Sequence, residues 1–260
     1  MKNELLLLAG SDIPFPEARV TIHQPTLKEI GYIGEKTFFT GCGFLDFSKD
    51  LLNQSDKTRL SDKNDFDILM SIMIDKNNAV KNIVESAMLV LSLIFPLYEV
   101  SVRKDRLAII LKKDNEEFEI NRNNYAIFKD ILVNMFNLKA SIDSKDKYNP
   151  QGDMAKRIAE KFKKRQEQLT KLKENIDPEK GVSVLSRYAS ILAIGLQKNL
   201  NELMQYTVYQ LYDEFQRFQL KVQWDAYIQA RMAGAKDLEE ADNWMIDLKD
   251  QGKQKNKTKK

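Results

Sequence analysis

The residues that most often carry chemistry in proteins are scarce in this chain. It has one histidine, His23, and one cysteine, Cys42. A cysteine nucleophile normally needs a histidine base, and these counts exclude metal sites built from two histidines or from several cysteines. His23 follows a predicted strand and precedes Pro25, which favours a turn histidine held by backbone groups. Cys42 lies between two glycines and is interpreted as a small buried or half-buried thiol rather than an exposed nucleophile.

The carboxylates and glycines form no recognisable catalytic motif. The phosphate-binding patterns G-x-x-x-x-G-K-[ST] and G-x-G-x-x-G do not occur, and neither does the nucleophile elbow G-x-S-x-G. Asp62, Asp65 and Asp67 cluster near Lys63. A helix N-terminus explains them best, because negative charge is favoured there, and a divalent metal site is the less favoured alternative. The sequence therefore predicts a protein that is not an enzyme and that has no cofactor and no metal.

Composition and charge narrow the class further. The chain has 260 residues, of which 43% are hydrophobic, so it can bury a core. The net charge of +3 becomes −2 without the five lysines of the tail 253–260. Such a balance is not typical of a dedicated nucleic-acid-binding protein. The longest apolar run, Ala87–Pro96, is too short to cross a bilayer. Glu4 and the four leucines after it do not fit a secretory signal; we expect a cytoplasmic protein whose short apolar start docks or pairs.

Hydrophobic periodicity predicts an α+β protein that is mainly α, with a small antiparallel sheet in an N-terminal mixed domain and a helical C-terminal region. The predicted boundaries are a mixed domain over 1–140, a linker over 141–150, a helical domain or arm over 151–250, and a disordered basic tail over 251–260. The predicted strands are Ala18–Ile22, Tyr98–Arg103, Arg106–Leu111 and Glu117–Ile120, and a two-residue turn, Lys104-Asp105, joins the second to the third. The predicted helices begin after Thr26 and cover Asp65–Ile74, Asn78–Phe95, Tyr125–Leu138, Met154–Lys173, Ser183–Met204, the segment from Thr207 to Gly234, and a short final helix from Asp237.

Two helix starts carry a capping box, in which a side chain at each end of a four-residue stretch satisfies a backbone N–H of the other. Thr26 with Glu29 is one, and Thr207 with Gln210 is the other. The segment Gly41-Cys42-Gly43 is predicted to end the first of these helices. Gly234 is predicted to end the second, since glycine suits the left-handed residue after a helix.

Two surfaces could bind a partner. The helix that starts at Thr207 has more aromatic rings than one face can bury, and Tyr209, Phe215, Phe218 and Trp224 are the predicted partner-binding residues. A basic segment between residues 156 and 173 could contact nucleic acid or an acidic partner. Its candidate residues are Lys156, Arg157, Lys163, Lys164 and Arg165. A solvated helix face or an acidic partner is favoured over nucleic acid, because only Phe162 is interleaved among these cations and it belongs to the apolar stripe.

Two stretches resemble proteins of tailed bacteriophages that infect Gram-positive hosts. Ile22–Phe39, IHQPTLKEIGYIGEKTFF, is similar to an N-terminal motif of tail-region proteins. Thr207–Leu248 resembles the C-terminal helices of phage tail assembly proteins, a group that includes tail assembly chaperones and other tail morphogenesis proteins: a capped aromatic helix, an Ala-Gly-Ala break and a short acidic helix with Trp. The resemblance implies a non-enzymatic protein that binds the tape measure protein or tail tube components during tail morphogenesis. It implies the host cytoplasm as the location, with the virion as the alternative.

Other interpretations of the sequence stay open. The chain is longer than many such chaperones, which leaves room for a structural virion component of the baseplate or neck. A nucleic-acid-associated accessory protein, using the basic segment and the Lys-rich tail, is a further alternative. No membrane association is expected, and a homo-oligomer is compatible with the sequence.

Overall fold

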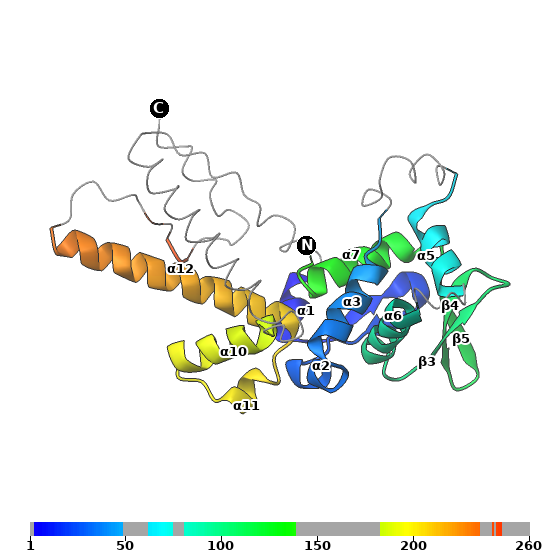
Figure 1. The fold of residues 1–260 in the computed structure, drawn as a ribbon, viewed down its shortest axis with the longest axis horizontal. Helices are drawn as coiled ribbons and strands as arrows, with labels where there is room; N and C mark the ends of the chain where they lie inside the picture. The colour runs from blue at the N-terminus through cyan, green and yellow to red at the C-terminus, as the bar shows by residue number, and fades with distance from the viewer. Residues whose placement is uncertain are drawn as a thin grey trace.

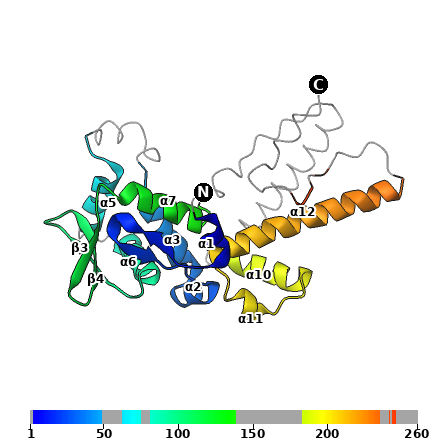
Figure 2. The same cartoon turned by 180° about the vertical axis from the view of Figure 1, so that it is seen from behind.

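The computed structural model describes residues 3–48, 62–74, 81–138, 183–234, 241 and 243–245. It has the predicted α+β arrangement, mainly α, with small antiparallel sheets in the N-terminal region and helices in the C-terminal part. Most N-terminal elements gather in one body, and the last long helix projects away from it with one shorter helix along its first half (Figures 1 and 2). Among the described residues, no helix is long and apolar enough to cross a membrane.

The helices and strands fall into three groups along the chain. The first group is α1 (Glu4–Ala9), β1 (Ile13–Phe15), the 3-10 helix η1 (Pro16–Ala18), β2 (Val20–Ile22), α2 (Leu27–Ile33) and α3 (Glu35–Leu45). The second is α5 (Asp65–Ile74), α6 (Lys81–Ile94), β3 (Glu99–Arg103), β4 (Ala108–Lys113), β5 (Glu116–Ile120) and α7 (Tyr125–Met135). The third is α10 (Val184–Gly195), α11 (Leu200–Leu203) and α12 (Val208–Met232).

The helices α3 and α6 pack closely at the centre of the body. Both bury an apolar stripe, and Phe38, Leu45, Val90 and Ile94 are fully buried. Gly41 lies inside α3, where a Cβ atom would stand 2.4 Å from the carbonyl oxygen of Ser86 on α6. The prediction that Gly41-Cys42-Gly43 ends a helix is therefore wrong, because Gly41 allows the two backbones to approach.

The predicted helix after Thr26 breaks earlier than expected. Gly34 separates α2 from α3 and has a φ of +86°. Only glycine adopts such a backbone readily, so this glycine, seven residues before Gly41, provides the break. The chain turns there and continues as α3.

Two antiparallel sheets stand beside the helices. In the first, β1 pairs with β2, and Ile13 lies opposite Ile22. In the second, the strand order is β3-β4-β5, which confirms the predicted hairpin and its added third strand. Arg103 lies opposite Ala108, so four residues, 104–107, form the turn instead of the predicted two. Leu107 takes a positive φ of 45° in this turn, consistent with Lys-Asp being poor chemistry for a two-residue turn.

The C-terminal region also departs from the expected helix lengths. Instead of one helix over Ser183–Met204, α10 ends at Gly195 and α11 is a separate short helix. Gln197 has a positive φ of 54°, which reverses the chain between them. α12 follows with 25 residues, about 37 Å at 1.5 Å per residue. Gly234, with a φ of +85°, stands just beyond its end as predicted.

Both predicted capping boxes are present. The Thr26 side chain accepts a hydrogen bond from the Glu29 backbone N–H at 3.2 Å, and a Glu29 carboxylate oxygen accepts one from the Thr26 N–H at 2.7 Å. The same reciprocal pair joins Thr207 and Gln210. The two helix starts predicted from these motifs are thus confirmed.

Replacing Thr26 by Ala is expected to lower the free energy of unfolding by about 0.5–2 kcal/mol, because the cap of α2 is lost. Urea unfolding followed by circular dichroism measures this change. Thr26→Ser is the matched control, since it keeps the capping oxygen and should stay close to the wild type. If the Ala and Ser variants were equally stable, the Thr26 side chain would not stabilise α2 as a cap.

Candidate partner-binding surface

The two stretches that resemble phage tail proteins meet in space. Thr26 and Thr207, the caps of α2 and α12, form an isolated antiparallel bridge. The Leu27 N–H donates to the Tyr206 carbonyl at 2.8 Å. Two helices that begin far apart in the sequence therefore start side by side, and the bridge fixes the origin of α12 on the body.

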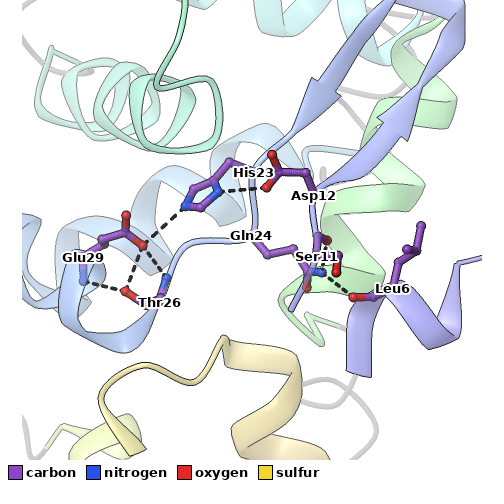
Figure 3. A network of polar contacts seen from close by, with 7 residues as sticks. All are labelled: Leu6, Ser11, Asp12, His23, Gln24, Thr26 and Glu29. Carbon is purple, nitrogen blue, oxygen red and sulfur yellow. Dashed lines mark hydrogen bonds and ion pairs between the residues drawn. The ribbon is translucent and has the colours of Figure 1, made fainter. Parts of the chain in front are cut away.

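Two glutamine side chains hold the N-terminal helix α1 at the same junction. Gln24 is buried, and its Nε2 donates to the carbonyls of Leu6 at 2.9 Å and Ser11 at 2.6 Å (Figure 3). Gln210 Nε2 donates to the Leu8 carbonyl at 2.8 Å. Carbonyls in the last turn of a helix lack partners within it, and Gln210 supplies one to Leu8. The Leu6 carbonyl already accepts a hydrogen bond from the Ser11 N–H at 3.0 Å, and Gln24 adds a second donor to it. These hydrogen bonds show how the apolar N-terminal segment docks on the body, as the sequence predicts.

His23 belongs to this junction and differs from its prediction. Its ring lies between two carboxylates, with Nδ1 3.0 Å from Asp12 Oδ1 and Nε2 3.4 Å from Glu29 Oε2 (Figure 3). The expectation of a ring held by backbone groups is therefore wrong. Partial burial raises the pKa of Glu29, but hydrogen bonds from Thr26 and His23 outweigh it, so that pKa lies below its ordinary value. The histidine, which directly follows β2, thus links the residue before β1 to α2.

Cys42 is fully buried within α3, as the sequence predicts for a small buried thiol. Burial raises the pKa of the thiol well above its ordinary value, and the nearby Asp46 carboxylate adds to this effect. The thiolate that a nucleophile needs is thus disfavoured. Among the residues that the structure describes, no three His, Cys, Asp or Glu side chains gather where they could hold a metal ion.

Three of the four predicted partner-binding rings contact the protein's own core. Phe215 is 8% exposed and stacks on Tyr188 of α10, with ring centroids 3.9 Å apart. Phe218 covers Gly195, where a Cβ atom would lie 2.3 Å from the ring. Tyr209 is half-buried against the core. The structure thus gives these three rings intramolecular partners, and their binding role stays a prediction.

The fourth ring belongs to a separate cluster near the far end of α12. Trp224 and Tyr227 are half-buried, with ring centroids 5.8 Å apart. Arg231 Nη1 donates to the Tyr227 hydroxyl at 3.1 Å, and its guanidinium lies 5.7 Å from the centre of that ring. We call these three residues the distal cluster. Trp, Tyr and Arg are the residue types most enriched among interface hot spots.

The distal cluster faces away from α10. Trp224 follows Phe215 by nine residues, and Tyr227 follows Phe218 by the same interval. At about 100° per residue, nine residues place a side chain on the opposite side of a helix. α12 therefore has two aromatic faces. The face near its start packs against α10, and the opposite face, near its far end, carries the distal cluster.

The pair formed by α10 and α12 is also fixed to the body through Glu35. The Glu35 carboxylate accepts hydrogen bonds from the Ser183 hydroxyl and from the Val184 N–H, the latter at 2.8 Å. A residue of α3 thus caps α10 from outside it, and an acidic side chain suits a helix N-terminus. α12 is consequently held at its cap, along α10, and at α1.

Sequence reasoning missed Tyr227, Arg231, Gln24 and Glu35 as parts of this surface and its support. The spacing i, i+3, i+7 of Trp224, Tyr227 and Arg231 was the available signal for the first two. No local signal identifies Gln24 or Glu35, because their partners are distant in the sequence. The basic candidates Lys156, Arg157, Lys163, Lys164 and Arg165 lie outside the described residues, as do the linker 141–150 and the Lys-rich tail.

Part of the C-terminal region matches a known protein family. Residues 179–249 match the family model described as the YomV second domain, a domain of Bacillus phage type. The matched segment covers less than half of the chain and contains α10, α11 and α12. It agrees with a phage protein and carries no detail of tail assembly. Searches of curated proteins and of solved structures found no significant match.

Proposed function

We propose that this protein is a non-enzymatic tail assembly protein of a bacteriophage, which binds the tape measure protein or tail tube components through the distal cluster of α12. The observation that carries the proposal is the second aromatic face of α12, formed by Trp224, Tyr227 and Arg231. It lies inside the segment that matches a phage-type domain. The resemblance of Thr207–Leu248 to phage tail assembly proteins supplies the partner class.

The contacts that hold the start of α12 on the body make its far half a suitable rigid surface for a partner. A partner surface gains affinity when it is rigid before binding, because less conformational entropy is lost. The start of α12 is fixed by the bridge to Thr26 and by Gln210, and its first half packs on α10 through Phe215. Its far half projects from the body (Figure 1). An apolar helix of a tape measure protein could lie along that half, with its side chains against Trp224 and Tyr227.

Replacing Trp224 or Tyr227 by Ala is expected to weaken partner binding by about 30-fold or more, because truncating an interface hot spot costs about 2 kcal/mol or more. The melting temperature should stay close to the wild type. The measurement is co-expression with the tape measure and tail tube proteins encoded nearby, then pull-down and titration of the purified pair.

Val222→Ala is the matched control for this experiment. Val222 is 49% exposed, lies two residues from Trp224 and points toward the α10 side of the helix. It should leave both binding and stability unchanged. The proposed surface would be rejected if the Trp224→Ala/Tyr227→Ala double variant bound the partner as tightly as the wild type. It would also be rejected if Val222→Ala weakened partner binding as much as Trp224→Ala or Tyr227→Ala does. A binding loss that follows only from unfolding would assign the two rings to the core.

A further inference from the structure

A cleft opens on the body between η1 and the outer edge of β5. Its volume is about 360 Å³, within the range of ligand sites in proteins. It is lined by Glu17, Ala18 and Arg19 on one side, by Arg106, Ile110 and residues 117–119 on the other, and by Asn121 and Asn124 at its end. These residues come from η1, the β3–β4 turn, the sheet and the start of α7. The distal cluster of α12 takes no part in the cleft.

Arg19 is the unpaired cation of the cleft. Its guanidinium lies 5.7 Å from the centre of the Phe118 ring. No carboxylate of the described residues lies within ion-pair distance of it, although its neighbours in the cleft include three glutamates. A guanidinium stacked on an aromatic ring keeps its N–H groups free at its edge, where they can bind a carboxylate in a bidentate manner. Arg19 is therefore prepared for an anionic group.

The backbone at Arg19 strengthens this interpretation. Its φ is +56°, in the left-handed region that glycine adopts with less strain. Ala18 and Val20 on either side are buried, which holds the residue in place. Folding alone would favour glycine at this position, so the guanidinium is retained at some cost to folding. Strained backbone of this kind gathers at functional sites.

The carboxylates of the cleft are not equivalent. Glu117 is engaged by Arg103 at 2.8 Å and by Arg106 at 3.6 Å. Glu119 accepts a hydrogen bond from Asn121 Nδ2 at 2.9 Å. Glu17 has no ion-pair partner among the described residues. Glu119 also lacks an ion-pair partner among the described residues, but the Asn121 amide holds its carboxylate. Arg19 and Glu17 are thus the charged side chains of the cleft that no described side chain engages through a salt bridge or hydrogen bond, and a ligand with both charges complements them.

The outer edge of β5 can pair with an extended chain. β5 ends the order β3-β4-β5, so no described strand lies on its outer side. Asn124 Nδ2 donates to the Glu119 carbonyl at 3.0 Å, so the backbone of Glu119 turns toward the cleft and Asn124 already occupies that carbonyl. In an antiparallel strand the residue two positions away turns the same way, so Glu117 presents its N–H and C=O to the same open edge. Such edges bind peptides by strand addition.

We propose that this cleft binds an extended segment of a partner protein by strand addition to β5, with an acidic and a basic side chain two residues apart. The acidic side chain pairs with Arg19, and the basic one pairs with Glu17. Side chains two residues apart on a strand face the same side, so both can turn toward η1 from a strand added to β5. The site is separate from the distal cluster of α12.

The test titrates the full-length protein with the capped pentapeptide Ac-Thr-Glu-Thr-Lys-Thr-NH2 and follows the arginine Nε–Hε and backbone amide signals by NMR. Saturable shifts at Arg19, Glu117 and Phe118 are expected at millimolar peptide. Arg19→Gly should bind about tenfold more weakly or worse with an unchanged or raised melting temperature, because glycine relieves the left-handed backbone. Gln197→Gly, at another left-handed position, is the matched control and should bind like the wild type.

The other arms separate the alternatives. The peptide with Gln in place of Glu should lose most of its binding, and Glu17→Gln should lose the preference for Lys over an uncharged residue. Inorganic phosphate that produces the same shifts with the same affinity would make the cleft a simple anion site and overturn the peptide assignment. The proposal also fails if the peptide causes no saturable shift, or if Arg19→Gly binds it as the wild type does.

Discussion

Replacing Phe215 by Ala is expected to lower the free energy of unfolding by about 3–5 kcal/mol, the usual cost of truncating a buried aromatic ring. Phe215 is 8% exposed and stacks on Tyr188, and Tyr188 also meets the edge of the Tyr212 ring, with centroids 5.4 Å apart. Loss of the Phe215 ring leaves a cavity between α10 and α12. The surrounding helices cannot close it easily, because α10 is capped by Glu35 and α12 by Thr207.

Chemical denaturation of the full chain measures this loss, with Tyr32→Ala as the control. Tyr32 lies on α2 and is 79% exposed, so its truncation should change stability by about 0.5 kcal/mol or less. The comparison also bears on the predicted partner anchors. If Phe215→Ala left stability unchanged but abolished partner binding, the ring would be an anchor as the sequence predicts, and it would not belong to a core between α10 and α12.

Helix starts were the most predictable part of this fold, because their signals are local. Thr26 with Glu29 and Thr207 with Gln210 each complete a capping box within four residues. The apolar stripes of α5, α6 and α7 likewise repeat within one helix. Such patterns need no knowledge of the rest of the chain.

The elements that the sequence mispredicted depend on distant contacts. Gly195 ends α10 where Phe218 of α12 covers it, and nothing in the residues around Gly195 signals that approach. The cap of α10 by Glu35 and the hold of Gln24 on α1 join segments that only the folded chain brings together. Periodicity alone therefore extended one helix over both α10 and α11.

The candidate site could be predicted only in part from the sequence, because the orientation of its rings depends on distant contacts. The number of rings on α12 showed that one face could not bury them all. Which rings turn inward depends on where α10 lies, and its position places Phe215 and Phe218 inside. Trp224 is the predicted anchor left on the other face, and Tyr227 joins it there. Nine residues separate Phe215 from Trp224 and Phe218 from Tyr227. Once one ring is known to face α10, this interval tells which rings lie on the opposite face.

The two glycines of α3 separate the effects of packing and helix propensity within one helix. Gly41 faces α6, and a Cβ atom there would stand 2.4 Å from the Ser86 carbonyl oxygen and 2.7 Å from Val90 Cγ2. Gly43 is exposed, and beyond the adjacent backbone of its own helix no atom lies within 4 Å of the position that a Cβ would take there. Both are equally unfavourable to an isolated helix, since glycine costs roughly 1 kcal/mol relative to alanine in a helix interior.

Gly41→Ala is therefore expected to destabilise the protein by about 3 kcal/mol or more, the upper part of the range for overpacked cores, because the obstructing atom belongs to backbone and cannot swing aside. Gly43→Ala should instead stabilise it by about 0.5–1 kcal/mol. Thermal and urea unfolding of the two variants test the opposite signs. If both variants gain stability, α3 and α6 do not approach closely at Gly41, and the glycines mark the end of a helix as the sequence alone suggests. If both lose stability, the outer face of α3 is covered at Gly43 as well. If Gly41→Ala lowers stability and Gly43→Ala raises it, Gly41 belongs to the contact between α3 and α6 at the centre of the body. Local helix propensity does not predict that contact.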